Sequence, residues 1–224
     1  MKNIVITGTS RGIGLQIALM LAAAGHRILA ISRKVPSELL GNANITCLSA
    51  DVADAASFVR IGAVLESWNS VDAIIHNAGA LALKPFAETT PENFEAIYRV
   101  NVFAVAELTR TALPYLVRGS HVVAISSMGG IQGSAKFAGL SAYSSSKGAV
   151  ITLMELLAEE YREKGISFNA LALGSVNTEM LAEAFPGYRA PLEASEMAGY
   201  IAQFALEGHK FYNGKVLPVS ATTP

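Results

Sequence analysis

The sequence predicts an α/β protein, a doubly wound domain built on a seven-stranded parallel sheet with helices on both faces. Short β-branched runs alternate along the chain with longer stretches of helical spacing, as in repeated strand–helix–strand units. Several of these runs are apolar at every position, which is typical of strands covered on both faces. No Pro/Gly/Ser-rich linker divides the 224 residues, so we expect a single domain over residues 1–224.

The individual elements follow from these patterns in chain order. The expected strands are Asn3–Ile6, Arg27–Ile31, Ile45–Leu48, Val71–His76, His121–Ile125, Ile166–Leu171 and Lys215–Val219. The expected helices are Ile13–Ala24, Ala53–Ser67, Pro91–Val117, Ala142–Lys164 and Leu192–Leu206. Between the second and third strands, Pro36 and Gly41 leave room for only a short helix.

Composition narrows the class of protein. Apolar residues make up 51% of the chain and charged residues 16%, which argues against disorder. The net charge of −1 gives no indication of nucleic acid or a membrane as a partner. We expect the single cysteine, Cys47, to be a buried structural thiol. The sequence shows neither a signal peptide nor an apolar run that could span a bilayer, so a cytoplasmic protein is expected.

A glycine-rich turn joins the first strand to the first helix. Residues Thr7–Gly14 read T-G-T-S-R-G-I-G, and the helical pattern follows directly. Such a turn presents backbone N–H groups and a helix N-terminus to a pyrophosphate, which is the arrangement of a Rossmann-type fold. The predicted cofactor contacts here are Gly8, Ser10, Arg11, Gly12, Ile13 and Gly14. A purely structural turn is the alternative interpretation.

The end of the second strand bears on the choice of cofactor. Enzymes that use NAD place an acidic residue there for the ribose 2′-hydroxyl. This chain has Ser32, Arg33 and Lys34 instead, with no carboxylate before Glu38. Basic side chains at this position, together with Arg11, favour a 2′-phosphate. We therefore expect NADP(H), with NAD(H) possible; in the alternative interpretation, the two bases belong to a solvated loop.

A candidate catalytic pair lies at Tyr143 and Lys147. Residues four apart share a helix face, and an ammonium group beside a phenol is expected to lower its pKa. Such a phenol can exchange a proton with an alkoxide. Ser126 and Ser127 end the fifth strand, where doubly wound sheets bind ligands, although a helix cap is an alternative role for Ser126. Asn101 interrupts an apolar helical segment, so it is expected to hold a water or bend the helix.

Together these motifs resemble the classical short-chain dehydrogenase/reductase family over essentially the whole chain. The resemblance implies the strand order 3-2-1-4-5-6-7 and a catalytic tetrad of Asn101, Ser127, Tyr143 and Lys147. It adds further cofactor contacts: Asp51 and Val52 at the adenine, Asn77, Ala78 and Gly79 after the fourth strand, and Gly174, Val176 and Thr178 at the nicotinamide. Tyr143 and Lys147 would also contact the cofactor.

The resemblance also implies a reaction, the transfer of hydride between the nicotinamide and a small-molecule carbonyl or secondary alcohol. Tyr143 would act as acid and base, Lys147 would lower its pKa and bind the ribose, and Ser127 would orient the carbonyl. Asn101 would position a water next to Lys147. No metal is expected, because the four histidines (26, 76, 121 and 209) lack ligand spacing; His76 and His121 are expected to be hydrogen-bonded in the fold.

Several positions depart from the family pattern. Leu173 stands where a proline is usual, and Ser127 and Tyr143 are farther apart than is usual, with the loop Met128–Leu140 as a candidate substrate wall. The segment 214–220 lacks the usual closing glycine pair. After Thr178, a short lid carries Met180, Leu181, Phe185 and Tyr188. These four side chains either line an open apolar pocket or simply pack against helices.

The sequence also bears on the oligomeric state and allows two alternative functions. The helices at 100–117 and 142–164 are apolar on more than one face, which predicts a homodimer or homotetramer through them. The same fold with NAD(H) is one alternative function. A non-catalytic NADP-binding sensor or scaffold is the other, although relatives in that role commonly lose the tyrosine or lysine, and both are present here.

Overall fold

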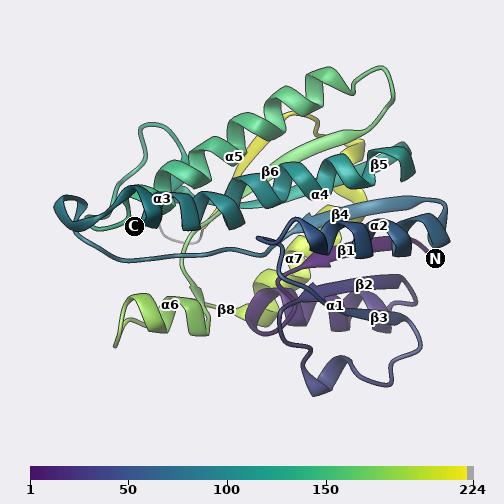
Figure 1. Ribbon diagram of the computed structural model, residues 1–224, viewed down its shortest axis with the longest axis horizontal. Helices are drawn as coiled ribbons and strands as arrows, with labels where there is room; N and C mark the ends of the chain where they lie inside the picture. The colour runs from purple at the N-terminus through teal and green to yellow at the C-terminus, as the bar shows by residue number, and fades with distance from the viewer. Residues whose placement is uncertain (221–224) are drawn as a thin grey trace.

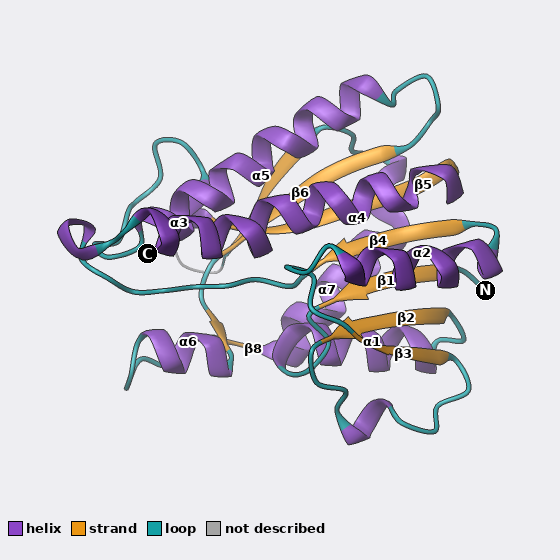
Figure 2. Cartoon of the chain, in the orientation of Figure 1, coloured by secondary structure: helices purple, strands orange, loops and turns teal. Residues whose placement is uncertain are grey.

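In the computed structural model, which describes residues 1–220, seven parallel strands form one sheet in the order β3-β2-β1-β4-β5-β6-β9. The strands are β1 (Asn3–Thr7), β2 (Arg27–Ser32), β3 (Ile45–Ser49), β4 (Val71–His76), β5 (Leu116–Ser127), β6 (Ser167–Leu173) and β9 (Lys215–Val219). The fold class, the strand order and all seven predicted strands are confirmed. Figures 1 and 2 show the sheet with helices on both faces.

Seven α-helices accompany the sheet within the described residues: α1 (Gly12–Ala23), α2 (Ala56–Trp68), α3 (Pro91–Tyr98), α4 (Ala104–Ala112), α5 (Ser141–Glu160), α6 (Glu179–Ala184) and α7 (Ala194–Glu207). A single 3₁₀ turn, Ser37–Leu39, occupies the segment between β2 and β3, as the sequence predicts. The short helix α6 and the two-residue strands β7 (Val176–Asn177) and β8 (Leu192–Glu193) are additional to the prediction.

The predicted helix Pro91–Val117 begins as expected, but it is interrupted and it ends earlier than predicted. At its start, Thr90 is the N-cap residue and forms a reciprocal capping box with Asn93. A π-helical turn, Arg99–Phe103, then separates α3 from α4. The helical stretch ends in a 3₁₀ turn at Leu113–Tyr115, and β5 begins at Leu116 rather than His121. Pro114 explains this end, because it has no N–H to continue the helix.

Alternate side chains of each strand pack into two separate hydrophobic cores, one on each face of the sheet. In β1, Val5 faces the core beneath α2, α4 and α5, whereas Ile4 and Ile6 face the core beneath α1 and α7. All three side chains are fully buried. Each contributes about 1.5–3 kcal/mol of burial free energy, so shifting the register by one residue would be costly. Both faces of the sheet are therefore fixed, and the carboxyl ends of the strands meet at one edge.

Two expectations about buried polar groups were tested. Cys47 is only half-buried, because β3 is an edge strand, so the expectation of a buried thiol is wrong. His76 and His121 are buried and hydrogen-bonded, to Thr109 and to Ala205 respectively, as expected. Burial lowers the pKa of His76 to about 3 and that of His121 to about 4, so both rings are neutral.

Within residues 1–220, His, Cys, Asp and Glu side chains form no group of three that is suited to a metal ion. None of the described helices combines the length and the apolar character that crossing a bilayer requires.

Candidate active site

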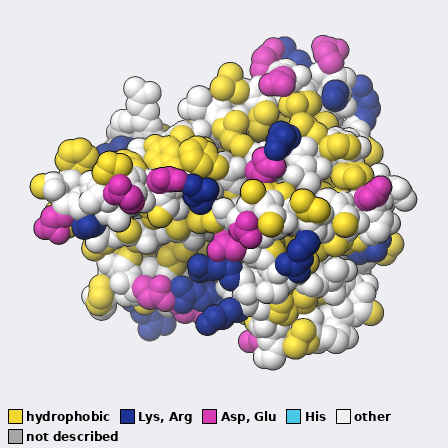
Figure 3. Space-filling model, viewed as in Figure 1, with side chains coloured by type: hydrophobic (Ala, Val, Ile, Leu, Met, Phe, Trp, Pro, Cys, Tyr) yellow, Lys and Arg dark blue, Asp and Glu magenta, His cyan; other side chains and the backbone are white. Residues whose placement is uncertain are grey.

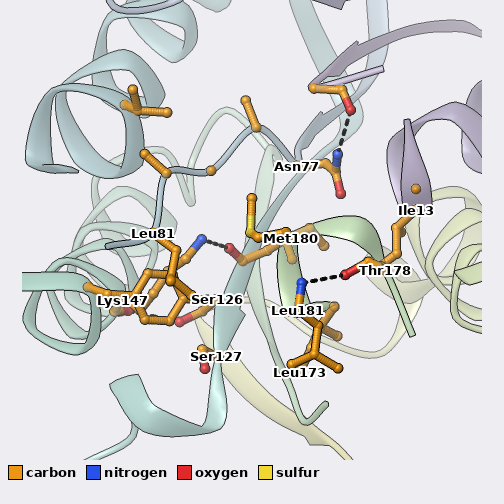
Figure 4. Close-up of a pocket in the computed structure, with 18 of the residues that line it drawn as sticks. Ile13, Asn77, Leu81, Ser126, Ser127, Lys147, Leu173, Thr178, Met180 and Leu181 are labelled. Atoms are coloured by element: carbon orange, nitrogen blue, oxygen red, sulfur yellow. Dashed lines mark hydrogen bonds between the residues drawn. The ribbon is translucent and has the colours of Figure 1, made fainter. Parts of the chain in front are cut away.

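A cavity of about 1090 Å³ lies at the carboxyl ends of the strands (Figure 4). The predicted site residues that line it are Gly8, Ser10, Arg11, Gly12, Ile13, Ser32, Arg33, Asp51, Val52, Asn77, Ala78, Gly79, Ser127, Tyr143, Lys147, Gly174, Val176 and Thr178. Three predicted residues, Gly14, Lys34 and Asn101, do not line it. One cavity therefore brings the glycine turn together with Tyr143, Lys147 and Ser127.

The glycine turn is held by close packing against the end of β4. A β-carbon added at Gly14 would lie 2.2 Å from the carbonyl oxygen of Gly8, so only glycine fits there. Asn77 Nδ2 donates to the carbonyl oxygens of Thr7 and Gly8, both at 3.1 Å. Gly14 and Asn77 thus shape the turn from behind, and Gly14 acts through packing rather than through contact with the cavity.

Helix α1 begins at Gly12 with an N-terminus suited to an anion. Its first turn, Gly12–Leu15, carries no acidic residue, and the backbone of Gly12 has a φ of +57° that favours glycine. The side chain of the N-cap residue, Arg11, makes no capping hydrogen bond. The first N–H groups of α1 are thus oriented as a phosphate-binding turn requires.

Tyr143 lines the cavity together with Ser127 and Lys147. The Ser127 side chain, at the end of β5, lies close enough to the Tyr143 hydroxyl to affect its pKa. Lys147 Nζ lies 5.7 Å from the centroid of the Tyr143 ring and donates to the carbonyl oxygen of Ile125 at 2.7 Å. Ser127 also accepts a hydrogen bond from the N–H of Gly129, which caps the following 3₁₀ turn.

The pKa of Tyr143 moves in the opposite direction to the sequence prediction. Burial raises the pKa of its phenol, and the hydrogen bond with Ser127 lowers it only in part. Burial also lowers the pKa of Lys147 to about 8. In the protein alone, desolvation thus outweighs the expected effect of the ammonium group on the phenol, because both groups are removed from water.

Asn101, which does not line the cavity, and Ser126, which does, both hold the segments around Tyr143 and Lys147 in place. Asn101 is buried in the π-helical turn, where Oδ1 accepts from the N–H of Ala80 at 2.8 Å. Its Nδ2 donates to the carbonyl oxygen of Ala80 and to Ser146 Oγ, both at 2.9 Å. Ser126 Oγ donates to the carbonyl oxygen of Lys147 at 2.8 Å. Ser126 therefore fastens α5 to β5 rather than capping a helix.

Of the two basic residues after β2, Arg33 lines the cavity and Lys34 does not, and contact of either residue with the cofactor stays a prediction. Ser32 explains the divergence: its Oγ donates to the carbonyl oxygen of Lys34 at 2.7 Å and closes a tight turn. Thr9 Oγ1 donates to Ser32 Oγ at 3.3 Å, which joins this turn to the glycine turn.

The lid over the cavity contains contacts that sequence reasoning missed. Arg11 makes a two-pronged ion pair with Glu183 of α6: Nη1 lies 2.5 Å from Oε1, and Nη2 lies 3.1 Å from Oε2. Tyr188, after α6, hydrogen-bonds with Ser175 at 3.0 Å. No sequence signal pointed to Glu183, because a hydrogen bond across 172 positions leaves no local pattern.

The rest of the wall is apolar. All four predicted lid residues, Met180, Leu181, Phe185 and Tyr188, line the cavity, which settles the two interpretations in favour of the pocket. The loop Met128–Leu140 contributes Met128, Gly129, Phe137 and Leu140 to the lining, as predicted. Leu81 and Leu173 are also among the apolar residues that line the cavity (Figure 4).

Comparisons with known proteins agree with this geometry. A family model described as short chain dehydrogenase matches residues 2–189. The chain is 30% identical to "Oxidoreductase UcpA" of Salmonella typhimurium, covering 90% of this chain and 87% of the relative. It is 34% identical to "Galactitol 2-dehydrogenase (L-tagatose-forming)" of Cereibacter sphaeroides, covering 78% of this chain and 71% of the relative.

A solved structure shows the same fold with a nucleotide present. It is a short chain dehydrogenase from Burkholderia cenocepacia J2315 in complex with NADP. This chain superposes on it with a TM-score of 0.88 and 26% identity, covering 99% of this chain and 97% of the other. The sequence match, the fold and the cavity agree, and the chain belongs to the short-chain dehydrogenase family of pyridine-nucleotide-dependent oxidoreductases.

Proposed function

We propose that this protein transfers a hydride between NADP(H) and a carbonyl or secondary alcohol, with Tyr143 as the acid and base. The observation that carries the proposal is that Tyr143, Ser127 and Lys147 line the same cavity as the glycine turn, with Lys147 Nζ 5.7 Å from the centroid of the Tyr143 ring. One domain, residues 1–224, holds both the cofactor site and the catalytic residues.

The residues present fit a dinucleotide. At the glycine turn, a β-carbon on Gly8 would lie 2.8 Å from the Cα of Ala78, so only glycine lets the turn pack closely against the end of β4, beside the N-terminus of α1. Asp51 and Val52 line the end of the cavity assigned to adenine, and Gly174, Val176 and Thr178 line the end assigned to the nicotinamide. When bound, the nicotinamide gives or accepts the hydride.

The protein's own groups handle the proton and orient the substrate. Ser127 donates to the substrate oxygen and keeps it within reach of the Tyr143 hydroxyl. Tyr143 gives its proton to the developing alkoxide, and the ammonium group of Lys147 stabilises the phenolate that remains. Asn101 fixes the backbone at Ala80 and holds Ser146, which shares α5 with Lys147, and we assign it the support of a water beside Lys147.

The proposal includes a preference for NADP(H) over NAD(H). Arg33 and Arg11 both line the cavity near Ser32, and no carboxylate lies between Ser32 and Glu38 in the sequence. Arginine binds a 2′-phosphate with a two-pronged geometry, which favours the phosphorylated cofactor. Turnover with NADPH and with NADH at equal concentration compares the two.

We also retain the prediction of a homodimer or homotetramer in the cytoplasm. Figure 3 shows apolar side chains gathered over α4 and α5. Phe103, in the π-helical turn before α4, is 54% exposed, and Leu156 of α5 is 62% exposed. Val105 and Met154 on these helices are buried within the protomer, so they do not contribute to this exposed surface.

A tyrosine-to-phenylalanine substitution tests the proposed chemistry. Tyr143→Phe should reduce kcat for NADPH-dependent reduction of aldehydes and ketones by about 10²–10⁴-fold, because it removes only the acid. NADPH binding, followed by fluorescence titration, should persist. The matched control is Tyr161→Phe at the end of α5, whose ring packs on Phe168 outside the cavity. Equal activity of wild type and Tyr143→Phe across a broad carbonyl and alcohol panel would refute the proposal.

A further inference from the structure

Arg11 is the residue for which we expect two anionic groups to compete. It lies within the glycine turn and lines the same cavity as Ser32 and Arg33, the region we assign to the 2′-phosphate. In the structure, however, both terminal nitrogens of its guanidinium group are engaged by the carboxylate of Glu183. The edge between the two terminal nitrogens holds one oxyanion at a time, so a phosphate that binds this edge has to displace the carboxylate.

Helix α6 directs a second carboxylate at the same turn. Glu179 lies four residues before Glu183 and therefore on the same side of the helix. Its Oε2 would lie 3.4 Å from a β-carbon placed on Gly12, at the N-terminus of α1. Glu179 thus stands beside the turn assigned to the pyrophosphate, which NADPH and NADH share, whereas Glu183 holds the arginine assigned to the phosphate that only NADPH carries.

The ion pair is weak enough to exchange. The side chains of Arg11 and Glu183 are 48% and 62% exposed, and exposed pairs contribute little because water and salt screen them. A phosphate carries more negative charge than a carboxylate and binds the same face of an arginine. The free energy needed to separate Arg11 from Glu183 is therefore small enough for a bound 2′-phosphate to supply.

We infer that Glu183 and the 2′-phosphate of NADPH compete for Arg11, so that Glu183 is a positioning residue that weakens the preference for NADP(H) over NAD(H). It acts through Arg11 and not by touching the reacting atoms. The inference rests on the proposed use of NADP(H). It also means that binding of NADPH, unlike binding of NADH, releases α6 from the glycine turn.

Cofactor titrations of the full-length protein test the inference through binding rather than turnover. Glu183→Gln should lower the dissociation constant of NADPH about two- to fivefold more than that of NADH, the range that an exposed ion pair represents. Glu179→Gln is the matched control, because it removes the same charge from the same helix. It should shift the two dissociation constants by similar factors, since both cofactors carry the pyrophosphate.

The same substitution made in an Arg11→Ala variant shows whether Glu183 acts through Arg11 or only through its charge. In Arg11→Ala, the added substitution Glu183→Gln should no longer change the ratio of the NADPH and NADH dissociation constants. Equal shifts for both cofactors in Glu183→Gln, or an unchanged ratio, would overturn the inference and leave the proposed function intact. An effect that persists without Arg11 would overturn it as well. Failure of the wild type to bind NADPH would overturn the inference together with the proposed use of NADP(H).

Discussion

Replacing Gly14 by alanine should destabilise the protein although it improves a helix. The added β-carbon would lie 2.2 Å from the carbonyl oxygen of Gly8 and 2.4 Å from Asn77 Nδ2. An ordinary carbon–oxygen contact is about 3.3 Å, so α1 and the turn must separate by about 1 Å. Neither the Gly8 carbonyl nor the tethered amide can rotate away, because Asn77 is bonded to both Thr7 and Gly8.

The magnitude follows from three effects. Overpacking costs about 1–3 kcal/mol, and weakening the two Asn77 hydrogen bonds costs about 0.5–1.5 kcal/mol each. Exchanging glycine for alanine inside a helix returns about 0.5–1 kcal/mol. The free energy of unfolding of Gly14→Ala should therefore fall by about 2–4 kcal/mol, which corresponds to a decrease of roughly 5–15 °C in Tm for a chain of this length.

Urea unfolding followed by circular dichroism measures this difference. Gly199→Ala in α7 is the matched control, because a β-carbon there meets nothing within 4 Å. It should raise the free energy of unfolding by about 0.5–1 kcal/mol. If Gly14→Ala were as stable as the wild type, the close approach of α1 to β1 would not be the reason for glycine at this position, and the reasoning would be refuted.

Two further predictions concern the catalytic wall. Lys147→Met should stabilise the protein at pH 7 by about 3 kcal/mol, because burial lowers the Lys147 pKa from 10.5 to about 8 and the folded state carries a costly buried charge. Between pH 8 and 10.5 only the unfolded state keeps the Lys147 proton, so the free energy of unfolding of the wild type rises with pH. The stability difference between Lys147→Met and the wild type should therefore shrink over this range. Urea unfolding of both proteins at pH 7 and pH 10 measures the difference, and an equal difference at the two pH values would contradict the prediction. Asn101→Ala should lower the free energy of unfolding by about 2–4 kcal/mol, because the buried Asn101 side chain loses its hydrogen bonds with Ala80 and Ser146. Thermal unfolding within 1 °C of wild type would contradict this.

Local chemistry explains what could be predicted from the sequence. The turn Thr7–Gly14 depends on residues a few positions apart, so its glycines are recognisable in the chain and the structure places them as expected. The strands were recognisable because burial on both faces leaves continuous apolar runs. Their ends were predicted within a few residues, except at β5, where helix and strand meet at Leu116 without an intervening loop.

Other features depend on tertiary contacts and leave no local pattern. The π-helical turn keeps the apolar spacing of a helix, so only the buried polar group of Asn101 hinted at it. The direction of the Tyr143 pKa shift depends on burial by side chains far away in sequence. Helix α6 has six residues, too few for periodicity to reveal, and its carboxylate at Glu183 meets an arginine from the start of the chain.

The strand order has a consequence for synthesis on the ribosome. The first four strands already form a contiguous half-sheet in the order β3-β2-β1-β4. Each later strand then joins the newest open edge: β5 pairs with β4, β6 with β5, and β9 with β6. No strand has to enter between two that are already paired. A nascent chain can therefore add each strand as it emerges, and β9 at the far edge is the last to join.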